Sequence, residues 1–154
     1  MCMQVDTQDE VNRPAKIRVV WKTVRKASRH SYHKGYFSQI QDAPIPAQGW
    51  YEAKGPLQIR EKHTIRGINA DGSFDCRFFK EVYGGAIHTF LNKPEQHGGY
   101  YVRIKCLAYP QDWIADGRYD GDQTQTQACY TKVYILGSLR SRIVRRVKDF
   151  FGLA

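Results

Sequence analysis

Alternation of apolar and polar side chains with a period of two is the feature of this sequence that most constrains its fold. Residues 100–108 read YYVRIKCLA, which places Ile104 and Cys106 on one face and Arg103 and Lys105 on the other. Successive side chains of a β-strand point to opposite sides, so this period is that of a strand. The segment therefore predicts a strand with one buried face and one wet face.

Other segments are rich in β-branched and aromatic residues and are separated by turn signals. The turn signals are Asn-Ala-Asp-Gly at 69–72 and Gly-Gly pairs at 84–85 and 98–99. We expect residues 42–48, with two prolines, to form an extended connection, and the polar stretch 110–127 to form a long one. Further strands are predicted over residues 16–24, 50–51, 57–65, 73–83 and 128–136.

The C-terminal segment 138–154 has a helical period instead. Ser138 supplies a cap and Gly152 a stop, while apolar residues such as Ile143 and Val147 recur on one arc. Most of its bases fall outside that arc. The segment predicts a basic amphipathic helix whose apolar side we expect to pack on the same domain.

These elements predict a mainly β, or α+β, protein. We expect an antiparallel β-sandwich or open barrel of about six to eight strands with one C-terminal amphipathic helix. A length of 154 residues suits one domain. We divide the chain into an acidic flexible N-terminal tail (1–12), a β-rich domain with a basic N-terminal segment (13–137) and the C-terminal helix (138–154).

The charge layout points to function. The formal net charge is +9, yet residues 41–137 hold 11 bases and 11 acids. Residues 11–40 hold eight Lys and Arg and no acid, and residues 138–154 hold five bases and one acid. Such blocks of one sign favour binding to an anionic polymer or surface. The competing interpretation is a solvated face that serves solubility.

Aromatic residues among the bases of the N-terminal region indicate nucleic acid, because cations neutralise phosphates while aromatic faces stack on unpaired bases. We therefore expect binding of RNA or single-stranded DNA with little base specificity, through a basic surface formed by both ends of the chain and by the wet face of strand 100–108. We assign Trp21 to the core, because it shares its strand face with Ile17 and Val19. The predicted nucleic-acid-binding residues are Lys22, Arg25, Lys26, Arg29, Tyr32, Lys34, Tyr36, Arg103, Lys105, Arg142, Arg145 and Arg146.

Two alternatives come from other classes of protein. One is a self-assembling structural protein, similar to a viral matrix or coat component in size and charge layout, which would contact nucleoprotein and an anionic membrane as a homo-oligomer. The other is a metal-independent ribonuclease that uses His63 or His88 with Glu61 and an arginine. No spacing supports the ribonuclease specifically, so we expect a protein that is not an enzyme.

Cofactor and metal sites find no support in the sequence. It contains no Gly-rich nucleotide-binding motif and no serine-hydrolase motif. Cys76, Cys106 and Cys129 lack the paired spacing of zinc sites, and we expect them to be buried thiols. No run approaches about 20 apolar residues, and the first residues do not resemble a signal peptide. We expect an intracellular protein, cytoplasmic or nuclear, with a peripheral membrane location as the alternative.

Overall fold

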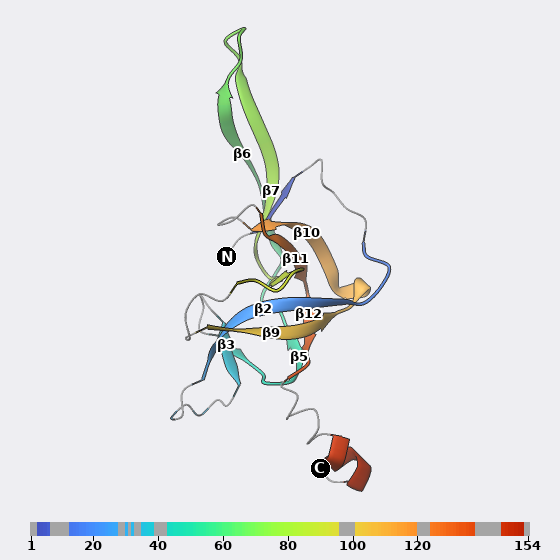
Figure 1. Ribbon diagram of the computed structural model, residues 1–154. Coiled ribbons are helices and arrows are strands. Elements are labelled where there is room, and N and C mark those ends of the chain that lie inside the picture. The colour runs from blue at the N-terminus through green and yellow to red at the C-terminus, as the bar shows by residue number, and fades with distance from the viewer. Residues whose placement is uncertain are drawn as a thin grey trace.

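The computed structural model describes residues 3–6, 13–27, 30, 32, 35–38, 43–95, 101–119, 124–137 and 146–152. Within them, twelve strands join through hydrogen bonds into one open antiparallel sheet, accompanied by a 3-10 turn and a short C-terminal helix at residues 146–151 (Figure 1). The protein is therefore mainly β.

The strands follow one another along the sheet in the order β5-β12-β9-β2-β8-β11-β10-β1-β7-β6, while β3 pairs with β2 and β4 pairs with β3. Their bounds are β1 (Met3–Asp6), β2 (Arg18–Lys26), β3 (Tyr36–Ser38), β4 (Pro44–Ile45), β5 (Gly49–Glu52), β6 (Gln58–Ile68), β7 (Phe74–Gly84), β8 (Ile87–Phe90), β9 (Tyr101–Ala108), β10 (Trp113–Tyr119), β11 (Thr126–Tyr130) and β12 (Lys132–Ile135), with the 3-10 turn η1 at Pro110–Asp112.

The sheet bends so that its two halves share one core. Val20 and Val24 of β2, Cys106 of β9 and Val133 of β12 pack in the same apolar cluster as Ala128 of β11, which lies in the other half of the strand order. Trp21 pairs with Phe90 where the halves meet. A sheet that folds over itself in this way buries one face without closing into a barrel.

The mainly β class and a C-terminal helix were predicted correctly, but the described residues form one open sheet of twelve strands, where a sandwich or open barrel of about six to eight strands was expected. The stretch 110–127, expected to be a connection, contains η1 and β10, whose Gly117 has no room for a side chain beside the Gln4 carbonyl. The segment 128–136 forms parts of two strands. Up to Tyr130 the chain forms β11, which pairs with β10 and β8. After Thr131 it forms β12, which pairs with β9 and β5.

The two ends of the chain also differ from the expectation. Residues Met3–Asp6, assigned to a flexible tail, form β1 between β10 and β7, where Met3 and Val5 are buried beside Val82. Their apolar side chains stand two residues apart and so reach the same buried face. At the other end, Phe150 is 84% exposed and is not covered by the core.

Strands β6 and β7 form a long two-stranded ribbon that projects from the body of the protein (Figure 1). We call these residues, 58–84, the arm. At its tip, Gly72 has a φ of 83° and its amide donates a hydrogen bond to the carbonyl of Asn69, as the predicted turn requires. At its base, β7 pairs with β1 as well as with β6.

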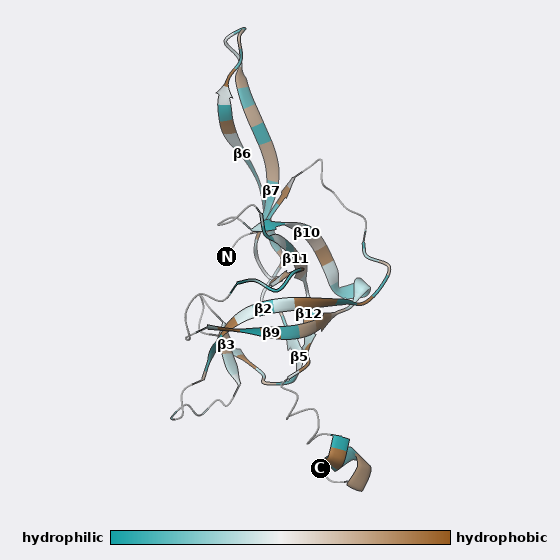
Figure 2. Ribbon diagram, viewed as in Figure 1, coloured by the Kyte–Doolittle hydropathy of each residue, from teal (hydrophilic) through white to brown (hydrophobic). Residues whose placement is uncertain are grey.

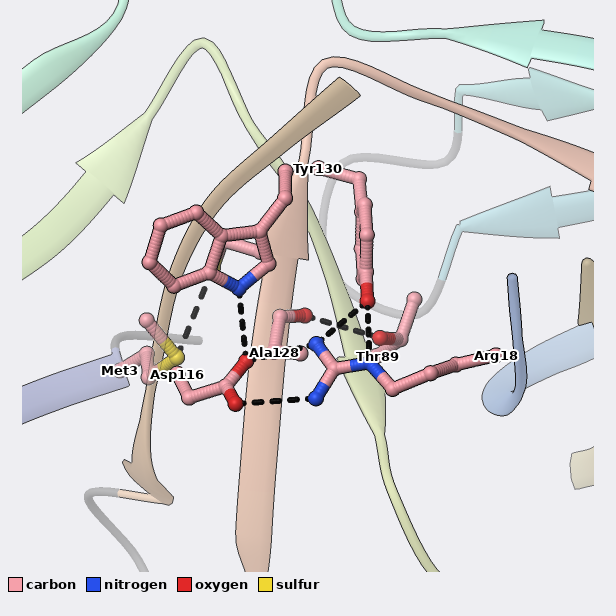
Figure 3. Close-up of polar contacts among 8 residues, drawn as sticks. Met3, Arg18, Thr89, Asp116, Ala128 and Tyr130 are labelled. Atoms are coloured by element: carbon pink, nitrogen blue, oxygen red, sulfur yellow. Dashed lines mark hydrogen bonds and ion pairs between the residues drawn. The ribbon is translucent and has the colours of Figure 1, made fainter. Parts of the chain in front are cut away.

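A polar network connects the two halves of the sheet (Figure 3). The Arg18 guanidinium on β2 donates two hydrogen bonds to the Asp116 carboxylate on β10, at 2.9 and 2.7 Å, and one from Nε to the Tyr130 hydroxyl at 2.8 Å. Trp113 Nε1 donates to the same carboxylate. Asp116 raises the pKa of Arg18, which therefore stays charged in its half-buried position.

We expect Asp116→Ala to lower the free energy of unfolding by about 2–4 kcal/mol, because it removes the carboxylate that balances the Arg18 charge and accepts the hydrogen bond of the Trp113 indole N–H. Urea titration monitored by fluorescence would measure this loss. The double variant Arg18→Met/Asp116→Leu should lose less stability than the sum of the losses of Arg18→Met and Asp116→Leu. A double-variant loss that equals this sum would contradict the network.

Candidate nucleic-acid interface

The pairing of β2 with β9 decides which side chains share a surface. Directly opposed residues of an antiparallel pair lie on the same face, and Trp21 stands opposite Lys105, Thr23 opposite Arg103, and Arg25 opposite Tyr101. The alternate residues Val20 and Val24 point into the core. The face that carries Trp21 is therefore the outer face of the sheet.

The same face continues across β12 and β5. Leu107 of β9 stands opposite Tyr134 of β12, and Tyr134 stands opposite Trp50 of β5. The Trp50 ring lies 5.3 Å from the ring of Tyr134 and 5.5 Å from that of Tyr109, measured between centroids. We define the aromatic–basic platform as Trp21, Trp50, Tyr101 and Tyr134 with Arg25, Lys93, Arg103, Lys105 and Lys132.

Cations of the platform lie against its rings. The Nζ atoms of Lys93 and Lys105 are each 5.1 Å from the centroid of the Trp21 ring, and Lys132 Nζ is 4.8 Å from that of Trp50. Such cation–π contacts hold ammonium groups beside an aromatic face while leaving them partly hydrated. Positive charge and stacking surface are thus presented together.

A loop shapes one margin of the platform. Arg103 donates a hydrogen bond to the carbonyl of Pro94, which ties the loop 91–95 to β9. Lys93 and Pro94 also line a hollow of about 450 Å³ together with Phe90, Asn92, Glu95, Thr124, Gln125 and Thr126. A volume of this size is in the range of small-molecule pockets and its lining is rich in hydrogen-bonding groups. Lys93, which lines the hollow, also contacts the Trp21 ring.

Lys22 belongs to the opposite face of β2. Its Nζ approaches the carbonyl of His88 at 3.4 Å, and burial lowers its pKa. Burial also lowers the pKa of His88 to about 4 and raises that of Cys106 to about 12, so these two groups are neutral near pH 7. A lysine in this position does not contribute to the platform.

The other predicted binding residues divide into three groups. Arg25, Arg103 and Lys105 lie together on the platform. Tyr36 packs against the core, Lys26 is exposed at the end of β2, Tyr32 is 95% exposed, and Arg146 is exposed on the terminal helix. The remaining four fall outside the described residues: Arg29, Lys34, Arg142 and Arg145.

Sequence reasoning missed part of the platform and placed Trp21 in the core. In β2, both faces carry β-branched residues, so the alternation of Val19, Val20 and Val24 with polar residues does not reveal which face is inside. Val19 is in fact half exposed and Val20 is fully buried. The available signal was in β9, whose wet face was predicted correctly and whose register with β2 places Trp21 beside Lys105.

Residues proposed for acid–base or metal chemistry are spread over the structure. His63 lies on the arm with its ring 5.9 Å from that of Phe78, and Glu61 stands two residues before it on the same face of β6. His88 is buried, as are the thiols of Cys106 and Cys129. The described part of the chain contains no group of three or more His, Cys, Asp or Glu side chains that could hold a metal ion.

Comparison of the chain with protein-family models, with curated proteins and with solved structures found no match.

We expect His88 to make stability depend on pH. Its folded-state pKa of about 4 lies below the ordinary value of 6.5, so the unfolded chain binds more protons as the pH falls. The stabilisation is complete above pH 6.5 and decreases below it, by about 2 kcal/mol between pH 7 and pH 5. Urea titrations at both pH values would show this decrease.

His88→Gln should reduce that pH dependence, because glutamine does not titrate. The matched substitution His30→Gln, at an exposed position, should keep the profile of the wild-type protein. An unchanged profile in His88→Gln would show that His88 is not the group responsible.

Proposed function

We propose that this protein binds single-stranded nucleic acid, RNA or DNA, on the aromatic–basic platform and with little base specificity. The observation that carries the proposal is the register of β2 with β9, which puts Trp21, Arg25 and Tyr101 on one sheet face with Arg103 and Lys105. Sheet-based single-strand binders present aromatic and basic side chains in this way.

Stacking would supply binding that does not depend on sequence. Every base has a π face, and each base–aromatic stack contributes about 1–3 kcal/mol. Trp50 is half exposed and lies on β5, and β12 and β9 separate it from Trp21 of β2 in the strand order. The two rings would therefore stack on different bases of one strand. Bases in a duplex are already stacked and paired, so we expect the platform to prefer single strands.

Neutralisation of phosphates would supply the rest of the binding free energy. The platform carries five cations. Its edge also holds one acid, Glu52 of β5, which stands opposite Lys132 of β12. The hollow beside Lys93 offers Asn92 and Thr126 as hydrogen-bonding groups for a base or sugar. The two ends of the chain would add further cations. Among the described residues, Lys26 and Arg146 are exposed cations of this kind.

Fluorescence anisotropy of a labelled oligonucleotide would test the proposal. We expect Trp21→Ala to weaken binding of a single strand by about 5- to 100-fold, since one stack is lost. Lys105→Gln should lower the slope of log affinity against log salt by about 0.7, the value for one phosphate contact of a single strand. A duplex of the same sequence should bind more weakly.

Lys22→Met is the matched control for Lys105→Gln, because the two lysines lie on adjacent strands but on opposite faces. We expect it to leave affinity and salt slope unchanged. If Trp21→Ala and Lys105→Gln bind as the wild-type protein does, or if Lys22→Met weakens binding equally, the platform is not the binding site.

A second candidate function is contact with an anionic membrane surface through the C-terminal helix, as a self-assembling structural protein would make. Phe150 and Phe151 are largely exposed beside Arg146 and Lys148, a combination that suits an interfacial helix. No helix among the described residues is long and apolar enough to cross a membrane.

Flotation with vesicles that contain anionic lipid would test this candidate. We expect the protein to float with anionic vesicles at low salt, to float less with neutral ones, and to lose flotation when residues 138–154 are deleted. The replacement of Phe150 and Phe151 by serine should have the same effect. Flotation that persists in both variants would contradict a role for the helix.

A further inference from the structure

The outer part of the arm has one largely apolar face and one charged face. Its register places Ile65 opposite Cys76, Ile68 opposite Phe74, and His63 opposite Phe78, so these residues share one side of the ribbon. On the other side, Arg60 and Lys62 form ion pairs with Glu81. Figure 2 shows apolar and polar residues alternating along both strands of the arm.

The apolar face is exposed along the outer part of the arm. Phe74 and Phe78 are 60% and 62% exposed, and Ile65 and Ile68 are exposed to a similar degree. Toward the base, Glu61 and Lys80, which stand opposite each other, interrupt this face before Ile59, which stands opposite the fully buried Val82. The apolar side chains of the outer arm therefore lie outside the core and have no cover from the described residues.

A ribbon of this kind is a poor structure on its own. An isolated two-stranded ribbon is marginally stable in water and gains stability only when its apolar face packs against something. Both strands have 11 residues, so the arm is far longer than a hairpin that only connects two core strands needs to be. The arm is long, and the apolar side chains of its outer part are exposed. Both features indicate that the arm packs against a partner.

We propose that the apolar face of the arm packs against the same face of a second copy of this chain, forming a two-fold dimer. This contact lies on a different surface from the aromatic–basic platform. The two ribbons lie face to face, with Ile65 and Phe78 near the centre of the contact.

The area fits such a contact. Five large apolar side chains, each more or less half exposed, offer roughly 500 Å² per copy, more than half of the about 800 Å² per partner in a standard interface. Those side chains are Ile59, Ile65, Ile68, Phe74 and Phe78. Neighbouring residues of the same face supply the remainder.

The distribution of charge favours the arm over the platform as the surface of contact between copies. A two-fold interface brings each patch against itself, so a patch must be compatible with its own charge. On the arm face, Glu61 stands opposite Lys80, and these charges balance. The platform, with five cations, would repel its own copy, and the net charge of +9 adds to that repulsion wherever the surfaces are basic.

The exposed edge of β6 is less suited to pairing with a second copy. Register shifts interrupt β6 between Gln58 and Ile59 and between Ile65 and Gly67. Bulges and charged side chains on edge strands are devices that prevent pairing at the edge. On the apolar face of the arm, the acidic and basic residues are limited to Glu61 and Lys80, whose charges balance, so face-to-face packing is favoured.

Sedimentation velocity of the nuclease-treated protein across roughly 1 to 100 µM tests the proposal. We expect the wild-type protein to form a dimer with a dissociation constant in the micromolar range. Ile65→Glu and Phe78→Glu should each raise that constant at least about 30-fold, because each substitution acts on both copies. Circular dichroism should show a wild-type fold for both variants, since the two side chains are exposed.

Thr64→Glu is the matched control: it adds the same charge one residue from Ile65 on the opposite face and should keep the dimer. A wild-type protein that stays monomeric overturns the proposal, as does a dimer that survives both Ile65→Glu and Phe78→Glu. Loss of the dimer in Thr64→Glu, or on deletion of residues 138–154, also overturns it, because the contact would then lie on another surface.

Discussion

The register between β2 and β9 is the constraint on which the rest of the structure depends. It pairs eight residues of β2, from Arg18 to Arg25, with β9. Trp21 of β2 also pairs with Phe90 of β8, where the two halves of the sheet meet. A shift by one residue would turn Val20 and Val24 outward and bring Trp21 inward. Core and platform are thus fixed by the same set of hydrogen bonds.

The buried side of that register contains polar groups that need compensation. Lys22 is desolvated beside His88, and Arg18 keeps its charge because Asp116 and Tyr130 accept its hydrogen bonds. The network around Asp116 also connects β2 with β11 and β10, which lie two and three places away from it in the strand order. Polar groups between the sheet halves therefore specify one way of bending the sheet, in addition to its apolar packing.

The proposed platform and the proposed dimer contact occupy different parts of the sheet. The platform lies on β5, β12, β9 and β2, whereas the arm is formed by β6 and β7 at the opposite end of the strand order. Two copies joined through their arms would keep both platforms accessible. Such a dimer would present two binding surfaces to one strand of nucleic acid, which raises the effective concentration of the second site.

The sequence alone determined the local structure: alternation in residues 100–108 specified β9 and its wet face, and Gly72 specified the turn of the arm. It could not reveal β10, whose residues lack clean alternation, or the strand at Met3–Asp6, which forms only because β7 and β10 lie on either side of it. Nor could it orient β2, since both of its faces carry branched apolar residues. Tertiary structure decided that Trp21 faces outward and Lys22 inward, because strand pairing over long sequence distances, and not local pattern, selects the face that the core covers.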